Sequence, residues 1–337
     1  MVSRGRWLGL GVAIALFLVS CLPPKVSLES APGRSPPAPL VASPSPTPTA
    51  PVTLTRPQAV PAANLERMMQ DLRALNFTRY RAADRDRARQ YLLDTLRADG
   101  WAATTQAFPG GQNVVAKPAQ AKAQVKRILL VAHYDTVSNS PGADDNASGV
   151  TVALEVARQL RSRPTAHQLE VTFFDQEEQG LIGSFAFAQN QANLANILGV
   201  INLEMLGFAC RTPNCQQYPQ GLPVTPPSDR GDFLAVVGDR EHPELLRAFH
   251  LAEDPTLPPL VTLPIPYKGA WTPDILRSDH APFWLNNIGA VMVTDTADFR
   301  NPHYHQPSDT VDTLDLDFLA GAAQRVMIAT AALLDSQ

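Results

Sequence analysis

The sequence lacks an excess of basic residues. Its 28 Lys and Arg stand against 32 Asp and Glu, which gives a formal net charge of −4. A chain with no basic balance offers little electrostatic attraction to phosphate backbones, so we expect no nucleic-acid partner. With 337 residues and 45% hydrophobic content, it is long enough to bury a sizeable core.

The apolar run near the N-terminus is too short to span a membrane. It extends from Trp7 to Val19, about 13 residues, whereas a spanning helix requires roughly 20. Basic residues precede it and small residues follow, as in an export signal covering residues 1–20. The letters LVSC resemble a bacterial lipobox, which predicts cleavage before Cys21, a lipid on its thiol and attachment to the membrane. An ordinary signal peptide with an incidental cysteine is the alternative.

Cysteine is scarce. Besides Cys21, the chain has only Cys210 and Cys215. An exported chain folds where disulfides persist, so this pair could close a small loop, with two free thiols as the alternative. No second pair of ligands lies nearby, which argues against a zinc site there.

Proline is concentrated in one region. Residues 23–61 hold twelve of the 31 prolines, with Ser, Thr and Ala between them. Such a composition predicts an extended spacer, which we place at residues 21–63. The rest of the chain, residues 64–337, alternates helical patterns with short β-branched or aromatic runs. This alternation predicts one domain with a three-layer α/β/α architecture and a mostly parallel, mixed central sheet. The expected strands include NVVAK, RILLVAHYD, LEVTFFDQEE, ILGVINLEM, FLAVVGD and GAVMVTDT.

Three expected strands end in acid or histidine, in the stretches LLVAHYD, VTFFDQEE and GVINLEM. In parallel sheets ligands bind at the carboxyl ends of the strands, so these groups should meet in one crevice. Carboxylates packed together raise one another's pKa unless a cation neutralises them. Histidine and carboxylate ligands without thiolate suit Zn²⁺, with Co²⁺ or Mn²⁺ as substitutes.

Six motifs follow one another along the chain: HYD, PGADDNASG, FFDQEEQGLIGS, INLEM, SDHAPFW and NPHYHQPSDT. In this order they resemble those of the co-catalytic zinc aminopeptidases, the clan MH metallo-exopeptidases that include bacterial leucyl aminopeptidases and glutaminyl cyclases. The similarity extends from about residue 64 onward and implies a phosphorylase/hydrolase-like zinc peptidase fold. It also implies hydrolysis of N-terminal residues from peptides by water that two zinc ions activate.

The resemblance implies a role for each matching residue. Glu177 would be the general base, and Asp135 would hold a ligand histidine in its metal-binding tautomer. The family pattern also implies a cis peptide between Asp145 and Asn146. Two zinc ions would be bound by five ligands: His133 and Glu204 on one ion, Glu178 and His305 on the other, and Asp145 on both.

Neighbouring residues receive supporting roles. Many members of the family carry aspartate where this chain has Glu204, whose side chain is one methylene longer. The change leaves a carboxylate ligand but alters the expected metal spacing. Ser278 and Asp279 are expected to hydrogen-bond the base or the substrate amine. His280 and His303 are expected to have supporting or structural roles.

Three other functions fit the same scaffold. A glutaminyl cyclase would use one zinc ion, and the complete set of five ligands argues against it. A carboxypeptidase would need a cation for the substrate carboxylate, for which Lys268, Arg277 and Arg300 are candidates. A peptide-binding lipoprotein without activity is the third. The loops at 207–230 and 254–274 are expected to line the specificity pocket, the second with Tyr267 and Trp271.

Overall fold

The structure is a computed structural model of the whole chain. Residues 51–337 form one compact unit. The predicted signal peptide, Cys21, most of the predicted spacer and Trp271 lie outside the described residues. The described residues are 53–58, 60–119, 125–219, 228–252, 254–270 and 272–336.

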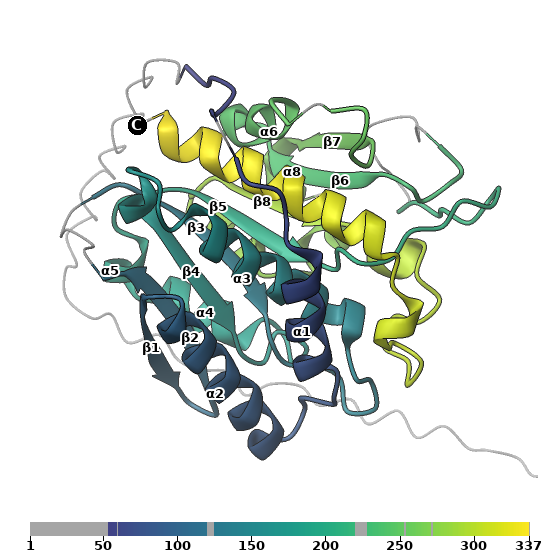
Figure 1. Cartoon of the computed structure of the whole chain (residues 1–337), viewed down its shortest axis with the longest axis horizontal. Coiled ribbons are helices and arrows are strands. Elements are labelled where there is room, and N and C mark those ends of the chain that lie inside the picture. Colours follow the sequence, from purple (N-terminus) through teal and green to yellow (C-terminus); the bar gives the residue numbers. More distant parts are fainter. Residues whose placement is uncertain are drawn as a thin grey trace, which may run out of the picture. The chain divides into compact units, whose positions relative to one another are not determined.

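Eight strands form one sheet in the order β1-β2-β4-β3-β5-β8-β6-β7 (Figure 1). The central strands β4, β3, β5 and β8 run parallel, as predicted. Antiparallel pairs lie toward both edges, where β1 pairs with β2, β2 with β4, and β6 with β8. The predicted mixed α/β sheet is therefore confirmed. The strands are β1 (Trp101–Phe108), β2 (Gly111–Pro118), β3 (Arg127–His133), β4 (Leu169–Phe174), β5 (Ile197–Glu204), β6 (Leu234–Asp239), β7 (Leu260–Ile265) and β8 (Ala290–Thr294).

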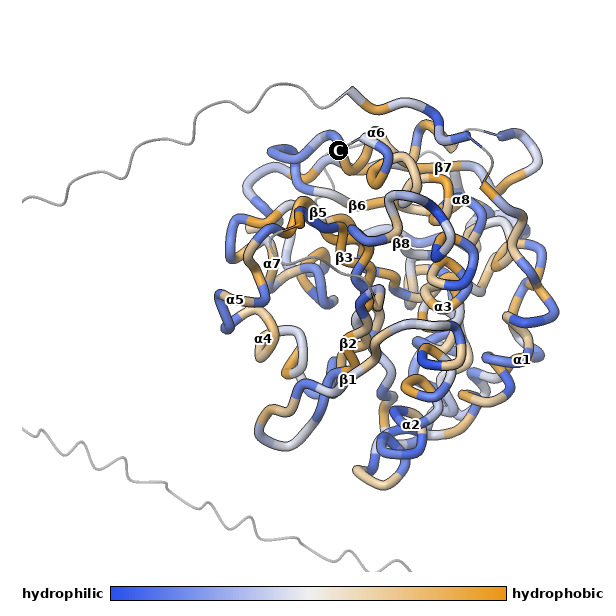
Figure 2. Tube along the Cα trace, turned by 60° about the vertical axis from the view of Figure 1, so that its left-hand side comes forward, coloured by the Kyte–Doolittle hydropathy of each residue, from blue (hydrophilic) through white to orange (hydrophobic). Residues whose placement is uncertain are grey.

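Helices cover both faces of this sheet. The larger layer lies in front of the strands in Figure 1, and the turned view in Figure 2 shows a smaller layer on the other side. The larger layer is α1 (Leu65–Leu75), α2 (Ala82–Ala98), α3 (Gly149–Leu160), α6 (Pro243–His250) and α8 (Leu316–Asp335), and the smaller is α4 (Ile182–Gln189), α5 (Gln191–Leu194) and α7 (Ala281–Leu285).

Strand β3 shows why both faces must be covered. Ile128 and Leu130 belong to the apolar cluster that contains the larger helical layer, whereas Leu129 and Val131 belong to the cluster with α4, α5 and α7. All four are at most 1% exposed. Successive strand residues point to opposite faces, so a continuously apolar strand is stable only between two layers. Each such side chain contributes about 1.5–3 kcal/mol on burial.

Local sequence signals fix several helix ends. The Asn64 side chain accepts a hydrogen bond from the amide of Arg67 at 3.1 Å and so caps α1. Helix α2 ends before Gly100, whose φ of +85° favours glycine.

Within the described residues, α8 is the one helix long and apolar enough to cross a membrane by length and composition. However, most of this helix is buried inside the structure, as in a core helix.

Two strands were not predicted. Strand β1 has three alanines among its eight residues, and alanine is depleted in strands. It is also an edge strand, paired only with β2. Strand β7 lies inside the segment 254–274, which was expected to be a loop. It contains Pro264, and proline is tolerated here because β7 is the other edge strand and pairs only with β6.

Candidate active site

The tips of three adjacent parallel strands provide four of the predicted site residues. His133 is the last residue of β3 and Glu204 the last of β5. Glu177 and Glu178 lie in the turn that follows β4, next to β3 in the sheet. Because these strands run in the same direction, their carboxyl ends meet at one edge of the sheet.

Asp145 arrives from a short irregular helix, Ala143–Ser148, between β3 and α3. The peptide bond between Asp145 and Asn146 is cis, which confirms the prediction. The carboxylate of Asp309 accepts hydrogen bonds from the amides of Asp144 and Asp145, at 2.8 and 3.1 Å. The backbone around Asp145 is thus fixed by a residue that lies more than 160 positions away in the chain.

The structure brings all five predicted ligands together, with Asp145 in the middle. One oxygen of Asp145 lies 3.3 Å from His133 Nε2, and its other oxygen lies 3.2 Å from His305 Nε2. His133 Nε2 is also 3.2 Å from Glu204 Oε1, and His305 Nε2 is 2.9 Å from Glu178 Oε2. The longer side chain of Glu204 therefore still reaches the histidine of β3.

Glu177 lies on the His133 side of this cluster. Ligand atoms of His133, Glu177 and Glu204 lie within 4.8 Å of one another, as do those of Asp145, Glu178 and His305. Asp135 accepts hydrogen bonds from the amides of Glu177 and Glu178 at 3.0 and 3.2 Å, and its carboxylate lies 3.5 Å from His133 Nδ1. One buried acid thus orients both the turn after β4 and the histidine of β3.

The cluster is electrostatically crowded. Burial raises the pKa of Glu178 to about 7, and burial together with neighbouring carboxylates raises the pKa of Glu177 well above its usual range. Burial disfavours the charged form of His133, but Glu204 and Glu177 outweigh this effect and raise its pKa. His305, between Asp145 and Glu178, has its pKa raised to about 10 despite partial burial. Such mutual shifts indicate acids and imidazoles that compensate one another.

The donor set fits divalent metal. Two imidazole nitrogens and several carboxylate oxygens converge, and the buried Oε1 of Glu178 has no hydrogen-bond partner among the described residues. Imidazole and carboxylate without thiolate suit Zn²⁺. One oxygen of Asp145 faces each histidine, so a single carboxylate is placed to serve two cations.

The residues predicted to support the site are placed differently from one another. The Ser278 hydroxyl donates to Glu204 Oε2. Asp279 is fully buried, and burial raises its pKa to about 7. His280 packs edge-on against Trp284, and burial lowers its pKa to about 4. His303 instead bonds the Ser308 hydroxyl at 2.9 Å.

Sequence reasoning missed Arg79, which is 1% exposed. Its guanidinium donates to the carbonyls of Tyr134, Pro141 and Gly142, at 2.7, 2.8 and 2.9 Å. It therefore fixes both the exit of β3 and the turn before Asp145. Nothing in the sequence around Arg79 signals this role. Asp309, by contrast, lies within the quoted motif NPHYHQPSDT and could have been identified from it.

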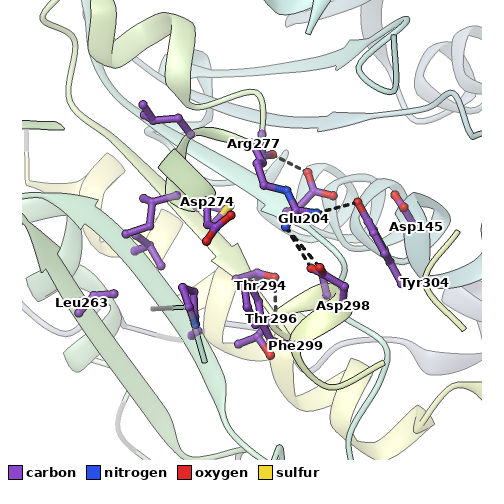
Figure 3. Close-up of a pocket in the computed structure, with 18 of the residues that line it drawn as sticks. Asp145, Glu204, Leu263, Asp274, Arg277, Thr294, Thr296, Asp298, Phe299 and Tyr304 are labelled. Carbon is purple, nitrogen blue, oxygen red and sulfur yellow. Dashed lines mark hydrogen bonds and ion pairs between the residues drawn. The ribbon is translucent and has the colours of Figure 1, made fainter. Parts of the chain in front are cut away.

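A cavity of about 510 Å³ opens beside the cluster (Figure 3). In this view Asp145 lies on the right, Leu263 of β7 on the left, and Glu204 between them. Between them the lining changes from acidic to apolar. The apolar part includes Phe233, Ala235, Val237, Val261, Leu263, Ile275, Leu276 and Met292.

Both predicted pocket loops contribute to this lining. Gln216, Gln217, Tyr218 and Pro219 come from the first, directly after a disulfide between Cys210 and Cys215. The paired cysteines confirm the favoured expectation. The second contributes Val261 and Leu263 of β7, and Asp274. Tyr267 is 65% exposed and is not among the lining residues.

Comparison with known proteins agrees with the arrangement. The chain is 33% identical to the protein YfbL of Escherichia coli K12 over 79% of this chain and 87% of that protein. The structure is similar to the LapA aminopeptidase of Legionella pneumophila, with a TM-score of 0.61, 19% identity, and coverage of 80% of this chain and 71% of that one.

A zinc aminopeptidase of Bacillus subtilis is also similar. Its TM-score is 0.50 at 26% identity, and the match covers 65% of this chain and 49% of that one. The sequence pattern of peptidase family M28 matches residues 113–331, a segment that contains every predicted ligand. The chain therefore belongs to peptidase family M28.

Proposed function

We propose that this protein is a zinc-dependent aminopeptidase that removes N-terminal residues from peptides. The observation that carries the proposal is the position of Asp145, which has one carboxylate oxygen near His133 and the other near His305. Membership of family M28 and similarity to proteins called aminopeptidases support it.

Two Zn²⁺ ions would be held at the cluster. His133 and Glu204 would bind one ion, Glu178 and His305 the other, and Asp145 both. When bound, the ions would supply Lewis-acid chemistry, polarising a carbonyl and acidifying water. The convergence of five such ligands makes this reading stronger than a cyclase with a single zinc ion.

Glu177 would be the general base. Its carboxylate lies against the cluster but is not needed to complete the five ligands. It would take a proton from the attacking water and deliver it to the leaving amine, a role worth typically 10²- to 10⁴-fold. Asp135 would act as a positioning residue, since it holds the amide of Glu177 and faces His133.

A carboxypeptidase is less well supported. Of its three candidate cations, Arg300 is buried and donates to the carbonyls of Gly231 and Phe233. Lys268 bonds Asn287 and Glu241 and does not line the cavity. Arg277 alone of the three lines the cavity.

We also propose the predicted organisation of the whole chain. Residues 1–20 would be an export signal, residues 21–63 a spacer, and residues 64–337 the catalytic domain. A lipid on Cys21 would attach the protein to the bacterial cell envelope, where the spacer would hold the domain away from the membrane. Labelling with a radioactive fatty acid, in wild type and in Cys21→Ala, tests this part of the proposal. Absence of label in the wild type would contradict it.

The activity is tested with purified full-length protein loaded with zinc. We expect hydrolysis of leucyl anilide, no hydrolysis when the amine is acetylated, and loss of activity with a chelator. Cyclisation of a glutaminyl substrate without anilide hydrolysis would favour the cyclase. Absence of any chelator-sensitive activity would favour a peptide-binding protein.

A further inference from the structure

Among the described residues that line the cavity, Arg277 is the only lysine or arginine. It precedes Ser278, whose hydroxyl donates to the proposed ligand Glu204. Figure 3 shows its guanidinium directed toward Asp298 and Tyr304, on the side of the cavity that carries Glu204. A cation is therefore present beside an otherwise acidic centre.

The present partners of Arg277 leave it able to bind a further anion. Its Nη1 lies 3.3 and 3.4 Å from the two oxygens of Asp298, and its Nη2 donates to the Tyr304 hydroxyl at 3.2 Å. The side chains of Arg277 and Asp298 are 42% and 40% exposed, and exposed ion pairs of this kind are weak. A guanidinium has five N–H donors, and its planar fork matches a carboxylate.

Arg277 is linked to the cluster through a single side chain, Tyr304, which suits a very short peptide. The Tyr304 ring stacks on the His305 ring with centroids 3.8 Å apart. The guanidinium thus lies one side chain away from a proposed metal ligand. Two extended residues span about 7 Å. A peptide whose first carbonyl lies at the cluster would carry its second residue toward Arg277.

We propose that Arg277 binds a carboxylate of the substrate, and that the preferred substrates are short peptides with a free C-terminus. This inference rests on the proposed aminopeptidase function and adds a substrate class to it. The same chemistry could also recognise an acidic side chain at the first residue, so the test separates the two sources of carboxylate.

The test compares matched substrates on zinc-loaded full-length protein. The dipeptide Leu-Gly and its C-terminal amide differ only in the carboxylate of interest, and glutamyl and leucyl anilides differ in the side chain. We expect kcat/KM to be about tenfold higher for Leu-Gly than for its amide, the effect of one charge-assisted hydrogen-bonded pair at a half-exposed site. If glutamyl anilide were preferred over leucyl anilide by a similar factor, the carboxylate bound by Arg277 would instead be that of an acidic first side chain.

Two variants and one control locate the effect. In Arg277→Gln, kcat/KM for Leu-Gly should be within about twofold of kcat/KM for its amide. Arg277→Lys should give an intermediate ratio, because lysine keeps the positive charge but lacks the planar pair of N–H donors. Lys268→Ala is the matched control, since Lys268 does not line the cavity, and its ratio should equal that of the wild type.

Binding without turnover separates this inference from the proposed function. In a Glu177→Ala background, calorimetry should show Leu-Gly binding about tenfold more tightly than its amide, and Arg277→Gln should remove the difference. If the wild type cleaves no anilide or peptide, the proposed aminopeptidase is wrong, while the calorimetry still decides the role of Arg277. Equal affinities for acid and amide, or a preference that Arg277→Gln leaves unchanged, would overturn the carboxylate site.

Discussion

The two ends of the cavity are built in opposite ways. At the acidic end, side chains from the tips of β3, β4 and β5 lie so close that burial and like charges shift the pKa values of Glu177 and Glu178 upward. At the other end, β6, β7 and β8 present apolar side chains such as Val237 and Leu263.

This difference indicates that the acidic end determines metal binding and rate, whereas the apolar end determines substrate preference. A cluster of acids requires a cation and fixed geometry, so small changes there should have large effects on metal binding and rate. An apolar wall discriminates through contact area, and changes of a methylene or two alter preference only modestly.

Asp145→Asn should have the largest effect. An amide carries no negative charge and offers only one carbonyl oxygen, so it cannot bind the ion beside His133 and the ion beside His305 together. We expect activity at background and zinc content well below two ions per chain, measured by atomic absorption after dialysis. Asp312→Asn, at an exposed position outside the cluster, is the control. Two retained zinc ions in Asp145→Asn would contradict the bridging role.

Glu177→Ala should separate turnover from metal binding. The five ligands remain, but the proposed proton acceptor is lost, so we expect kcat to fall by about 10²- to 10⁴-fold with zinc content unchanged. Gln179→Ala, on the exposed side of the same turn, should keep wild-type kcat. Full activity of Glu177→Ala would show that another group takes the proton.

Asp309→Asn tests the support of Asp145 rather than the ligand itself. Asp309 accepts hydrogen bonds from two successive amides, and an asparagine would direct an N–H at one of them. Partners that orient metal ligands typically contribute 10- to 100-fold in metal affinity. We expect a loss in that range, measured by competition with a zinc chelator. Unchanged zinc affinity would show that the loop holds Asp145 without this contact.

Replacement of both Cys210 and Cys215 by serine should have the smallest effect on chemistry. The disulfide closes the loop that leads into Gln216 and Tyr218 of the cavity wall. We expect a loss of about 2 kcal/mol in unfolding free energy and a several-fold rise in KM for peptides, with kcat close to wild type. A fall in kcat as large as that of Glu177→Ala would show that the loop of the cavity wall affects the reaction rate and not only substrate binding.

The acidic end could be predicted from the sequence residue by residue, whereas for the apolar end the sequence indicated two lining loops but not strand β7, which forms part of the wall. His133, Glu178 and Glu204 sit at the ends of strands that their apolar runs reveal, and parallel strands bring such ends together. The resemblance supplied Asp145 and His305, which arrive on irregular segments.

The apolar wall depends on contacts between distant segments. Pro264 argued against a strand at β7, and the position of β7 beside β6 follows from pairing at the sheet edge rather than from a local pattern.

Arg79 supports the acidic centre through the carbonyls of residues 134, 141 and 142. A side chain bonded to backbone carbonyls requires no particular residue type in its partners, so the sequence contains no signal for it.

The most direct test of the account is a crystal structure of the zinc-loaded full-length protein with anomalous diffraction at the zinc edge. We predict two anomalous peaks at the tips of β3, β4 and β5, each within bonding distance of a different oxygen of Asp145. A single peak, or two peaks with Asp145 bound to neither or only one, would contradict the account.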